Sequence, residues 1–264
     1  MTLDGEARGA YLVLEEPDEA ALRTQARVRS VIRRRNDAER ARPEVKHSVG
    51  DPAVALAEYR GLVELARGLR GEALLEGLER AMDLDGYLNW MALMTLLENG
   101  DYVDEVLFVG TDATDARGEV VPYFHAVGWD PDDLYSACHH GGRDAIPDPA
   151  GLLYCAESDF DEVIFADASV YRRYVEVLEN LIQRLTPEAF DAVLERVWGL
   201  LWPLLSQDEV RGAMVEFLED YPEGATQDGA RAVIQGALDE LSTKHRARRE
   251  LLQTRISAWR EAQP

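Results

Sequence analysis

The sequence predicts an α+β protein that is mostly helical and contains one small antiparallel hairpin. Apolar residues recur at three- and four-residue spacings over 51–98 and 169–260, the period of amphipathic helices. Two β-rich runs, "EVLFVG" and "EVVPYFHAVGW", are separated by the turn-forming "TDATDARG", which predicts a hairpin over 103–128. With 46% hydrophobic residues among 264, the chain can bury a core without cross-links.

Residues 1–50 are expected to hold short strands and a basic connecting segment. The run "AYLVL" at 10–14 predicts a short buried strand, and 28–34 predicts a second one. The stretch 27–42, "RVRSVIRRRNDAERAR", is rich in arginine, but acidic and amide side chains alternate with the basic ones and no aromatic is present to stack on bases. We therefore interpret it as a solvated or partly ion-paired segment.

Residues 51–264 are predicted to form a mainly helical domain. The expected helices cover 51–71, 72–82, 84–98, 169–185, a segment opened by Thr186 and Pro187, a segment opened by a capping box from Ser206 to Glu209, and 228–260. The third helix has Asp83 or Asp85 as its N-cap and is apolar on nearly all sides, so it is expected at the centre of the domain. After Thr186, the aromatic residues Phe190, Trp198 and Trp202 fall at helical spacing with Val197 and Leu201 and are predicted to be core.

Residues 128–168 are expected to form a long loop rich in Gly, Pro and Asp. The loop holds both cysteines, Cys138 and Cys155, which could form a disulfide in an oxidising compartment or remain as two free thiols. With His139 and His140 they have the donors for zinc, but adjacent ligands fit poorly into one tetrahedron and no CxxC pair is present, which argues against zinc. The loop is either a lid over a substrate cleft or a spacer held by a disulfide, and we favour the spacer.

The charge and hydropathy of the chain exclude several classes of partner. A formal net charge of −22 repels nucleic-acid phosphates and anionic lipids, so we expect no nucleic-acid partner. No run approaches the roughly 18 consecutive apolar residues of a membrane span, so we expect no membrane insertion. The N-terminus lacks the basic start and the small-residue cleavage site of a signal peptide, and the compartment stays unknown at this stage.

Two aspartates are predicted to converge at one end of the hairpin. Asp101 precedes the first strand and Asp130 follows the second, so pairing of the strands brings them to the same end. Such a pair suits a divalent cation that bridges phosphates, with one carboxylate on the metal and the other facing an attacking hydroxyl. We expect their carboxyl oxygens within about 8 Å of each other. The alternative is that both aspartates only form turns.

Three blocks of the sequence resemble the spore coat protein H-like (CotH) kinase family. They are "LDGEARGAYLVLEE" at 3–16, "LDGYLNWMALMTLLENGDYVDEVLFV" at 84–109 and "GWDPDDLY" at 128–135. In that family a "NGE..G.YLL.E" strand precedes a helix that ends in "GN.D", and a later strand ends in "WD.D". The resemblance implies an atypical protein-kinase-like fold, here its carboxyl-terminal lobe, and transfer of phosphate from ATP to protein hydroxyls with Mg²⁺ or another divalent cation.

The resemblance also assigns roles to individual carboxylates. Asp101 matches the catalytic-loop aspartate, Asp130 the metal-binding aspartate and Asp132 the second aspartate of "WD.D". Where the family has an asparagine in the loop, this chain has Asp104 and Glu105, which could still ligate a cation but add negative charge facing ATP. The metal ligands implied are thus Asp130, Asp132 and Asp104.

One departure from the family concerns the residues that would hold ATP. Family members carry an amino-terminal lobe with a phosphate-contacting lysine before the "NGE" strand, which starts here at residue 3, and the only lysines are Lys46 and Lys244. We therefore interpret 1–50 as the remnant of a hinge region and the chain as a carboxyl-terminal lobe. As given, it is expected to bind Mg²⁺ or Mn²⁺ weakly and to transfer little phosphate.

Two other functional classes stay open. One is a pseudoenzyme or protein-binding module that displays the 128–168 loop to a partner, and the other is a cation-binding structural protein that uses the same carboxylates without a nucleotide. The protein partner is a substrate in the kinase reading and a binding partner in the pseudoenzyme reading. The family resemblance favours an extracytoplasmic location for the complete protein, as do two cysteines in one loop.

Overall fold

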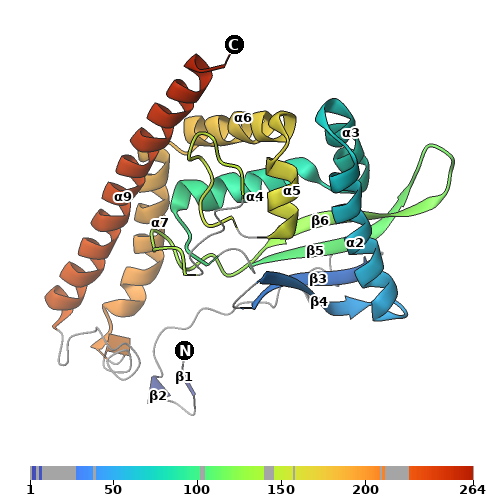
Figure 1. Cartoon of the computed structure of the whole chain (residues 1–264). Helices are drawn as coiled ribbons and strands as arrows, with labels where there is room; N and C mark the ends of the chain where they lie inside the picture. The colour runs from blue at the N-terminus through green and yellow to red at the C-terminus, as the bar shows by residue number, and fades with distance from the viewer. Residues whose placement is uncertain are drawn as a thin grey trace. The chain divides into compact units, whose positions relative to one another are not determined.

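The computed structural model describes residues 2–3, 6–7, 28–37, 40–101, 105–139, 146–156, 158–208, 210–211 and 226–263 (Figure 1). The predicted strand over 10–14 lies outside these residues. The chain divides into two compact units, one made of Met1–Leu14 with Arg184–Ala247 and a larger one made of Glu15–Gln183 with Arg248–Pro264. In the described part of the chain, no helix has the length and apolar character that a bilayer crossing requires.

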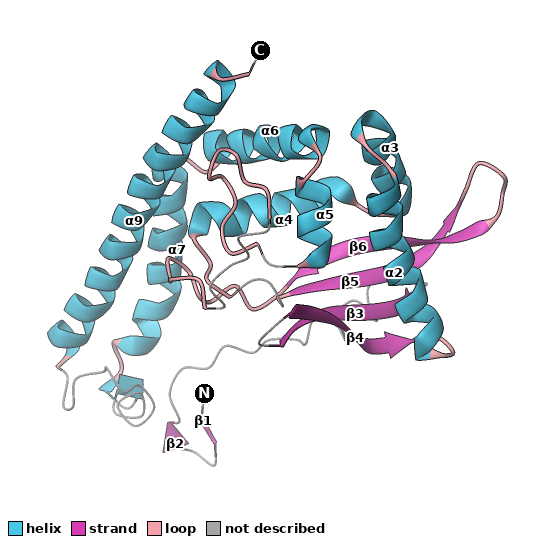
Figure 2. Ribbon diagram, viewed as in Figure 1, coloured by secondary structure: helices cyan, strands magenta, loops and turns pink. Residues whose placement is uncertain are grey.

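The larger unit is built on one antiparallel sheet, drawn in magenta in Figure 2, with strand order β4-β3-β5-β6. The predicted hairpin is present as β5 (Val106–Thr114) and β6 (Val120–Gly128), paired in continuous register from Val106 opposite Gly128 to Thr114 opposite Val120. Alternate residues of β5 face opposite sides, so Phe108 points to one face while Leu107 and Val109 join a small buried cluster on the other. The fold class predicted from the sequence, α+β with mostly helix, is confirmed.

The strand predicted over 28–34 is present, and of the two alternatives for 27–42 the partly ion-paired one fits the described arginines Arg29 and Arg34, whereas a solvated segment was wrong. The strands are β3 (Val28–Asp37) and β4 (Arg40–Ser48), and β3 is a central strand that pairs with both β4 and β5. Arg34 is 1% exposed and is paired in the core. Its charge misled the sequence interpretation because the acidic partner that makes burial possible, Asp161, lies more than a hundred residues away in the chain.

Three helices follow the first pair of strands, close to the predicted positions. They are α2 (Pro52–Gly68), α3 (Gly71–Ala81) and α4 (Leu84–Leu97). Asp51 caps α2 by accepting a hydrogen bond from Ala53 N, and Asp83 caps α4 by accepting one from Gly86 N. α4 is buried along most of its length and packs on β6, as its uniformly apolar sequence predicts.

An aromatic cluster joins the helices to the sheet. Tyr59 of α2, Tyr87 of α4, Phe108 of β5 and Phe160 pack with ring centroids 5.1–5.9 Å apart, mostly edge to face. Phe124 of β6 contacts the Tyr59 ring from the other side at 6.2 Å. This cluster holds the hairpin rigidly against α2 and α4, so the end of the hairpin has a defined position relative to the end of α4.

The predicted loop over 128–168 contains a helix that the sequence interpretation missed. α5 (Asp159–Phe165) begins with a capping box in which the Ser158 hydroxyl accepts from Asp161 N and the Asp161 carboxylate accepts from Ser158 N. The S-x-x-D pattern signals this start, but the helix is only two turns long, so its apolar period is weak. α6 (Ala168–Arg184) then follows at the predicted position.

The smaller unit contains α7 (Pro187–Leu205), the first part of α9 (Gln227–Glu261), and the short strands β1 (Thr2–Leu3) and β2 (Glu6–Ala7). Phe190 is buried and stacks on His245 at 4.2 Å, and Trp198 stacks on Trp202 at 4.9 Å. The prediction that these aromatic residues are core is confirmed for Phe190 but only in part for Trp198 and Trp202, which are half-buried; Val197 and Leu201 beside them are 37% and 36% exposed.

Candidate active site

The site begins at the C-terminal end of α4, where the chain turns sharply toward β5. Glu98 has a left-handed φ of 48° and ends the helix. The Arg248 guanidinium pairs with Glu98 at 3.0 Å and donates to the Thr95 carbonyl at 3.0 Å, which places a cation where the helix dipole is negative. This end of α4 is therefore held by α9 as well as by its own cap.

Asn99 fixes both sides of the turn. It is fully buried; its Oδ1 accepts a hydrogen bond from Asp101 N at 2.8 Å and its Nδ2 donates to Glu105 Oε2 at 3.2 Å. One side chain thus sets the backbone of Asp101 and the carboxylate of Glu105. This arrangement keeps two acidic residues close together, which would otherwise separate by repulsion.

Glu105 is the most strongly perturbed carboxylate of the site. It is 5% exposed, and burial raises its pKa to about 8, assisted by the negative charges of Asp101, Asp132 and Asp130 and opposed by the hydrogen bond from Asn99. The side chain is therefore surrounded by carboxylates in a place with little water. A group of this kind gains stability from a bound cation, which offsets both the burial of the charge and the repulsion.

The end of β6 delivers the second acidic segment. Trp129 N donates to the Glu105 carbonyl at 2.9 Å, so Asp130 begins directly beside the start of β5. A Cβ at Gly128 would lie 2.2 Å from the Trp90 ring, so glycine is what allows β6 to approach α4 this closely. The Arg33 guanidinium of β3 lies 4.6 Å from the centre of the Trp129 ring and brings positive charge to this edge of the sheet.

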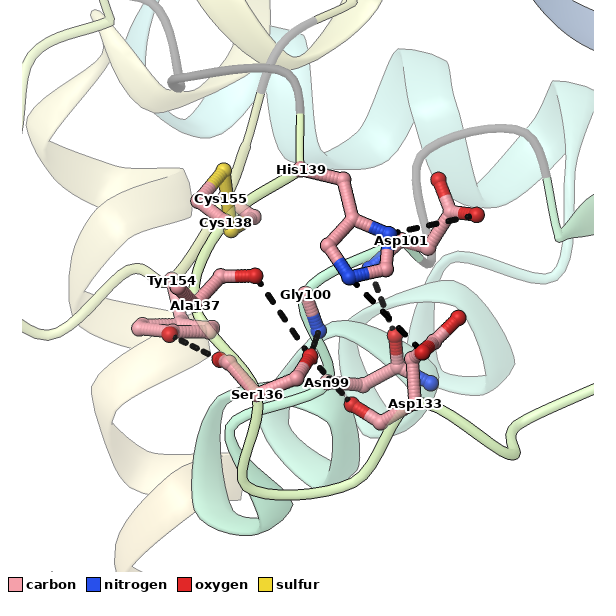
Figure 3. The surroundings of a disulfide bond; sticks show 10 residues. All are labelled: Asn99, Gly100, Asp101, Asp133, Ser136, Ala137, Cys138, His139, Tyr154 and Cys155. Atoms are coloured by element: carbon pink, nitrogen blue, oxygen red, sulfur yellow. Dashed lines mark hydrogen bonds and ion pairs between the residues drawn. A yellow bond between two sulfur atoms is a disulfide. The ribbon is translucent and has the colours of Figure 1, made fainter. Parts of the chain in front are cut away.

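The loop after Asp130 folds back onto the end of α4 (Figure 3). Tyr135 N donates to the Leu97 carbonyl at 2.8 Å and Ser136 N donates to the Glu98 carbonyl at 3.2 Å. A Cβ at Gly100 would lie 2.1 Å from the carbonyl oxygen of Ala137, so only glycine admits the loop here. These bonds satisfy the last carbonyls of α4 and bring Asp133 and His139 to the turn.

His139 lies between two of the aspartates, as Figure 3 shows. Its Nδ1 is 3.7 Å from Asp101 Oδ2, and its Nε2 is 3.7 Å from Asp133 Oδ1. The backbone of His139 is fixed because its N–H donates to the Gly100 carbonyl at 2.9 Å. The preceding residue, Cys138, is joined to Cys155 by a disulfide with Cα atoms 5.5 Å apart, so neither sulfur is a free thiolate in this structure.

Among the residues that the structure describes, two groups of side chains have ligand atoms close enough to hold a metal ion. One is Asp101, Asp133 and His139, and the other is Glu105, Asp132 and Asp133; in each group the ligand atoms lie within 4.8 Å of one another. The second group offers only carboxylate oxygens, which are the donors that Mg²⁺ and Mn²⁺ prefer. The residues present therefore fit a hard divalent cation.

The structure brings together most of the residues predicted from the sequence. Asp101 and Asp132 each belong to one of the two groups, and the charge of Asp130 acts on Glu105. The expected separation of about 8 Å between Asp101 and Asp130 stays a prediction. Asp104 lies outside the described residues, so its proposed role as a ligand also stays a prediction.

Two residues of the cluster, Asp133 and His139, were absent from the predicted site. Glu105 was named beside Asp104 as a residue that could ligate a cation but was left out of the implied ligand set, and Asp133 lies inside the quoted "GWDPDDLY" block. His139 had no such signal: its place beside Asp101 depends on the loop docking onto α4, and sequence spacing does not reveal that.

Comparison with known proteins gives one match. A family model described as CotH kinase protein matches residues 1–252, nearly the whole chain. This range includes every residue of the two groups of potential metal ligands. No curated protein matches the chain, and no solved structure matches it.

Proposed function

The chain belongs to the CotH kinase family, and we propose that its site transfers phosphate from ATP to hydroxyl groups of a protein with the help of a divalent cation. The observation that carries the proposal is the convergence of acidic side chains on the buried Glu105 at the open end of the hairpin. Phosphoryl transfer needs this kind of array, since the reaction depends on positioning and on cations that neutralise phosphate charge.

Each carboxylate has a proposed role in this reaction. Asp101, 31% exposed at its side chain, faces the acceptor hydroxyl and accepts its proton. Asp130 and Asp132 hold the cation, and Glu105 contributes from the buried side, with Asp104 as a further candidate ligand. The cation, when bound, neutralises the phosphate oxygens of ATP. The part of the chain that carries these residues is proposed to correspond to the carboxyl-terminal lobe of a kinase-like fold.

A second candidate function is a cation-binding, kinase-like protein that does not transfer phosphate and that binds a protein partner through 128–168. Glu105 favours this alternative, because it places a carboxylate near the position where the family has a neutral asparagine. The additional negative charge repels the triphosphate unless a cation offsets it. Cation binding with no transfer at all is the outcome that this alternative predicts, whereas the kinase site is expected to transfer a little phosphate in a way that depends on Asp101.

One set of measurements separates the two functions. Calorimetric titration with Mg²⁺ or Mn²⁺, with and without ATP, is combined with a labelled-phosphate assay on the wild type, Asp101→Asn, Asp130→Asn and Glu176→Gln. Glu176 is an exposed residue of α6, so its variant controls for the loss of one negative charge. For a kinase, Asp130→Asn weakens cation binding roughly tenfold or more, and Asp101→Asn abolishes transfer while cation binding changes little.

The opposite outcomes decide against the proposal. If the wild type binds the cation but transfers no phosphate to any protein in the assay, the cation-binding alternative holds. If the wild type binds neither Mg²⁺ nor Mn²⁺, the carboxylates only form turns and both functions are excluded. The Glu176→Gln control is expected to match the wild type in all of these measurements.

A further inference from the structure

The two ring nitrogens of His139 face different carboxylates. Nδ1 faces Asp101 and Nε2 faces Asp133, each at 3.7 Å, so the imidazole stands between the two aspartates rather than beside them (Figure 3). A histidine that ligates a metal with one ring nitrogen usually donates its other N–H to a carboxylate, so two flanking carboxylates fit a ligand as well as a spacer. Mg²⁺ and Mn²⁺ prefer oxygen donors to imidazole, however, which favours the role of a spacer that links two carboxylates.

Asp133 connects this spacer to the cation ligands. It belongs to both groups of potential ligands, one with Asp101 and His139 and the other with Glu105 and Asp132. Asp101 is in the first group only. An unrestrained Asp101 carboxylate this close to a divalent cation would be attracted into its coordination shell, where it could no longer face an acceptor hydroxyl.

We propose that His139 is a positioning residue that pairs with Asp101 and keeps its carboxylate out of the cation's coordination shell. The cation is then held by the carboxylate-only group together with Asp130, and Asp101 remains directed toward the acceptor. This inference rests on the proposed role of Asp101 in phosphoryl transfer. It adds a residue that neither the family match nor the spacing of the aspartates identifies.

The structure holds His139 firmly enough for this task. Its N–H donates to Gly100 O, one residue before Asp101, and the neighbouring Cys138 is cross-linked to Cys155. The backbone segments that carry the imidazole and Asp101 are thereby held together. A side chain whose backbone is fixed in this way can orient its partner at a reduced cost in conformational entropy.

The test is a double-mutant cycle read by Mn²⁺ affinity, which does not require the protein to be active. In the wild type, Asp101→Asn is expected to change the affinity less than about twofold, because Asp101 is not a ligand. In the His139→Ala background, Asp101 joins the cation, so the same substitution is expected to lower the affinity about fivefold or more. His139→Gln keeps an N–H donor and is expected to behave as the wild type, and His47→Ala controls for the loss of an imidazole elsewhere.

Pulsed electron paramagnetic resonance of bound Mn²⁺ gives a second readout. The wild type is expected to show no hyperfine coupling to an imidazole nitrogen, and such a coupling, lost in His139→Ala, would overturn the proposal by showing that His139 is a ligand. Equal effects of Asp101→Asn in both backgrounds would also overturn it. If the wild type does not bind Mn²⁺ at all, the proposed function fails together with this inference, whereas the preceding outcomes leave the cation site intact.

Discussion

Two clusters of charged residues in the larger unit are built on opposite principles. In the core, Arg34 of β3 donates to Tyr87, Ser158 and Asp161, and the Arg34–Asp161 pair is 3.2 Å apart with side chains 2% and 0% exposed. At the end of the hairpin, Glu105 is also buried, but its charged neighbours are aspartates. One cluster balances its charge within the protein, and the other does not.

The difference separates a structural role from a functional one. A buried ion pair with further hydrogen bonds to Tyr87 and Ser158 positions β3 against α4 and α5, and removing either partner leaves an uncompensated charge. A buried carboxylate surrounded by like charges destabilises the fold unless something outside the chain neutralises it. Such unbalanced groups concentrate at functional sites, where the missing charge is supplied by the ligand.

The largest expected effect comes from breaking the balanced cluster. Arg34→Ala leaves Asp161 buried without its cation and is expected to lower the free energy of unfolding by about 3–5 kcal/mol. Arg173→Ala, which removes an exposed partner of Asp85, is the control and is expected to cost about 1 kcal/mol or less. Urea unfolding measures both. Similar losses in the two variants would show that the core pair does not differ energetically from a surface pair.

The next effect concerns the unbalanced cluster and depends on pH. The pKa of Glu105 is raised from 4.5 to about 8 in the folded protein, so the folded state holds this proton more tightly than the unfolded state. The associated stability is fully present below pH 4.5 and is lost as the pH rises to about 8. In the absence of divalent ions and above pH 8, the free energy of unfolding of Glu105→Gln should therefore be about 2–4 kcal/mol higher than that of the wild type.

Urea unfolding at pH 5, 7 and 9 in the presence of a chelator measures this dependence, with Glu176→Gln as the control for one lost charge. The difference between Glu105→Gln and the wild type is expected to grow with pH, while the control stays level with the wild type. A Glu105→Gln variant that is less stable than the wild type at pH 9 would show that other groups of the protein compensate the negative charge of the Glu105 carboxylate.

The smallest effect is that of the cation itself. At ten times its dissociation constant, Mg²⁺ or Mn²⁺ is expected to raise the free energy of unfolding of the wild type by about 1.4 kcal/mol. The cation should raise the free energy of unfolding of Glu105→Gln by less, because one ligand charge is gone. It should stabilise Arg173→Ala as much as the wild type. An equal rise in the free energy of unfolding of all three proteins would show that the cation does not bind at Glu105.

Short-range patterns were sufficient to predict the helices and the hairpin. Asp51, Asp83 and Thr186 cap the helices that their sequence context predicts, and the turn between β5 and β6 lies where the polar run indicates. The hairpin alone explains why Asp130 and Glu105 share one end of the sheet. These features depend on residues a few positions apart, whose interactions do not need the rest of the fold.

The short helix α5 and the burial of Arg34 were beyond sequence reasoning for a different reason. The sequence predicted a strand over 28–34 but not the burial of its Arg34, because only the packing of Asp161, Ser158 and Tyr87 around Arg34 makes that charge acceptable in the core. These partners are 53 to 127 residues away along the chain. Local composition therefore indicated the strand but not that one of its charges lies in the core.

By itself, the sequence determined the family, the fold class and the two acidic segments that flank the hairpin, because each is encoded in local pattern and spacing. Only the tertiary structure decided that Glu105 is buried among them and that His139 stands between Asp101 and Asp133. The physical reason is that these contacts arise when the loop over 133–139 docks on the end of α4, through backbone hydrogen bonds and the close approach at Gly100. Backbone bonds of this kind are available to almost any sequence, so their partners become defined only when the packed core holds the two segments side by side.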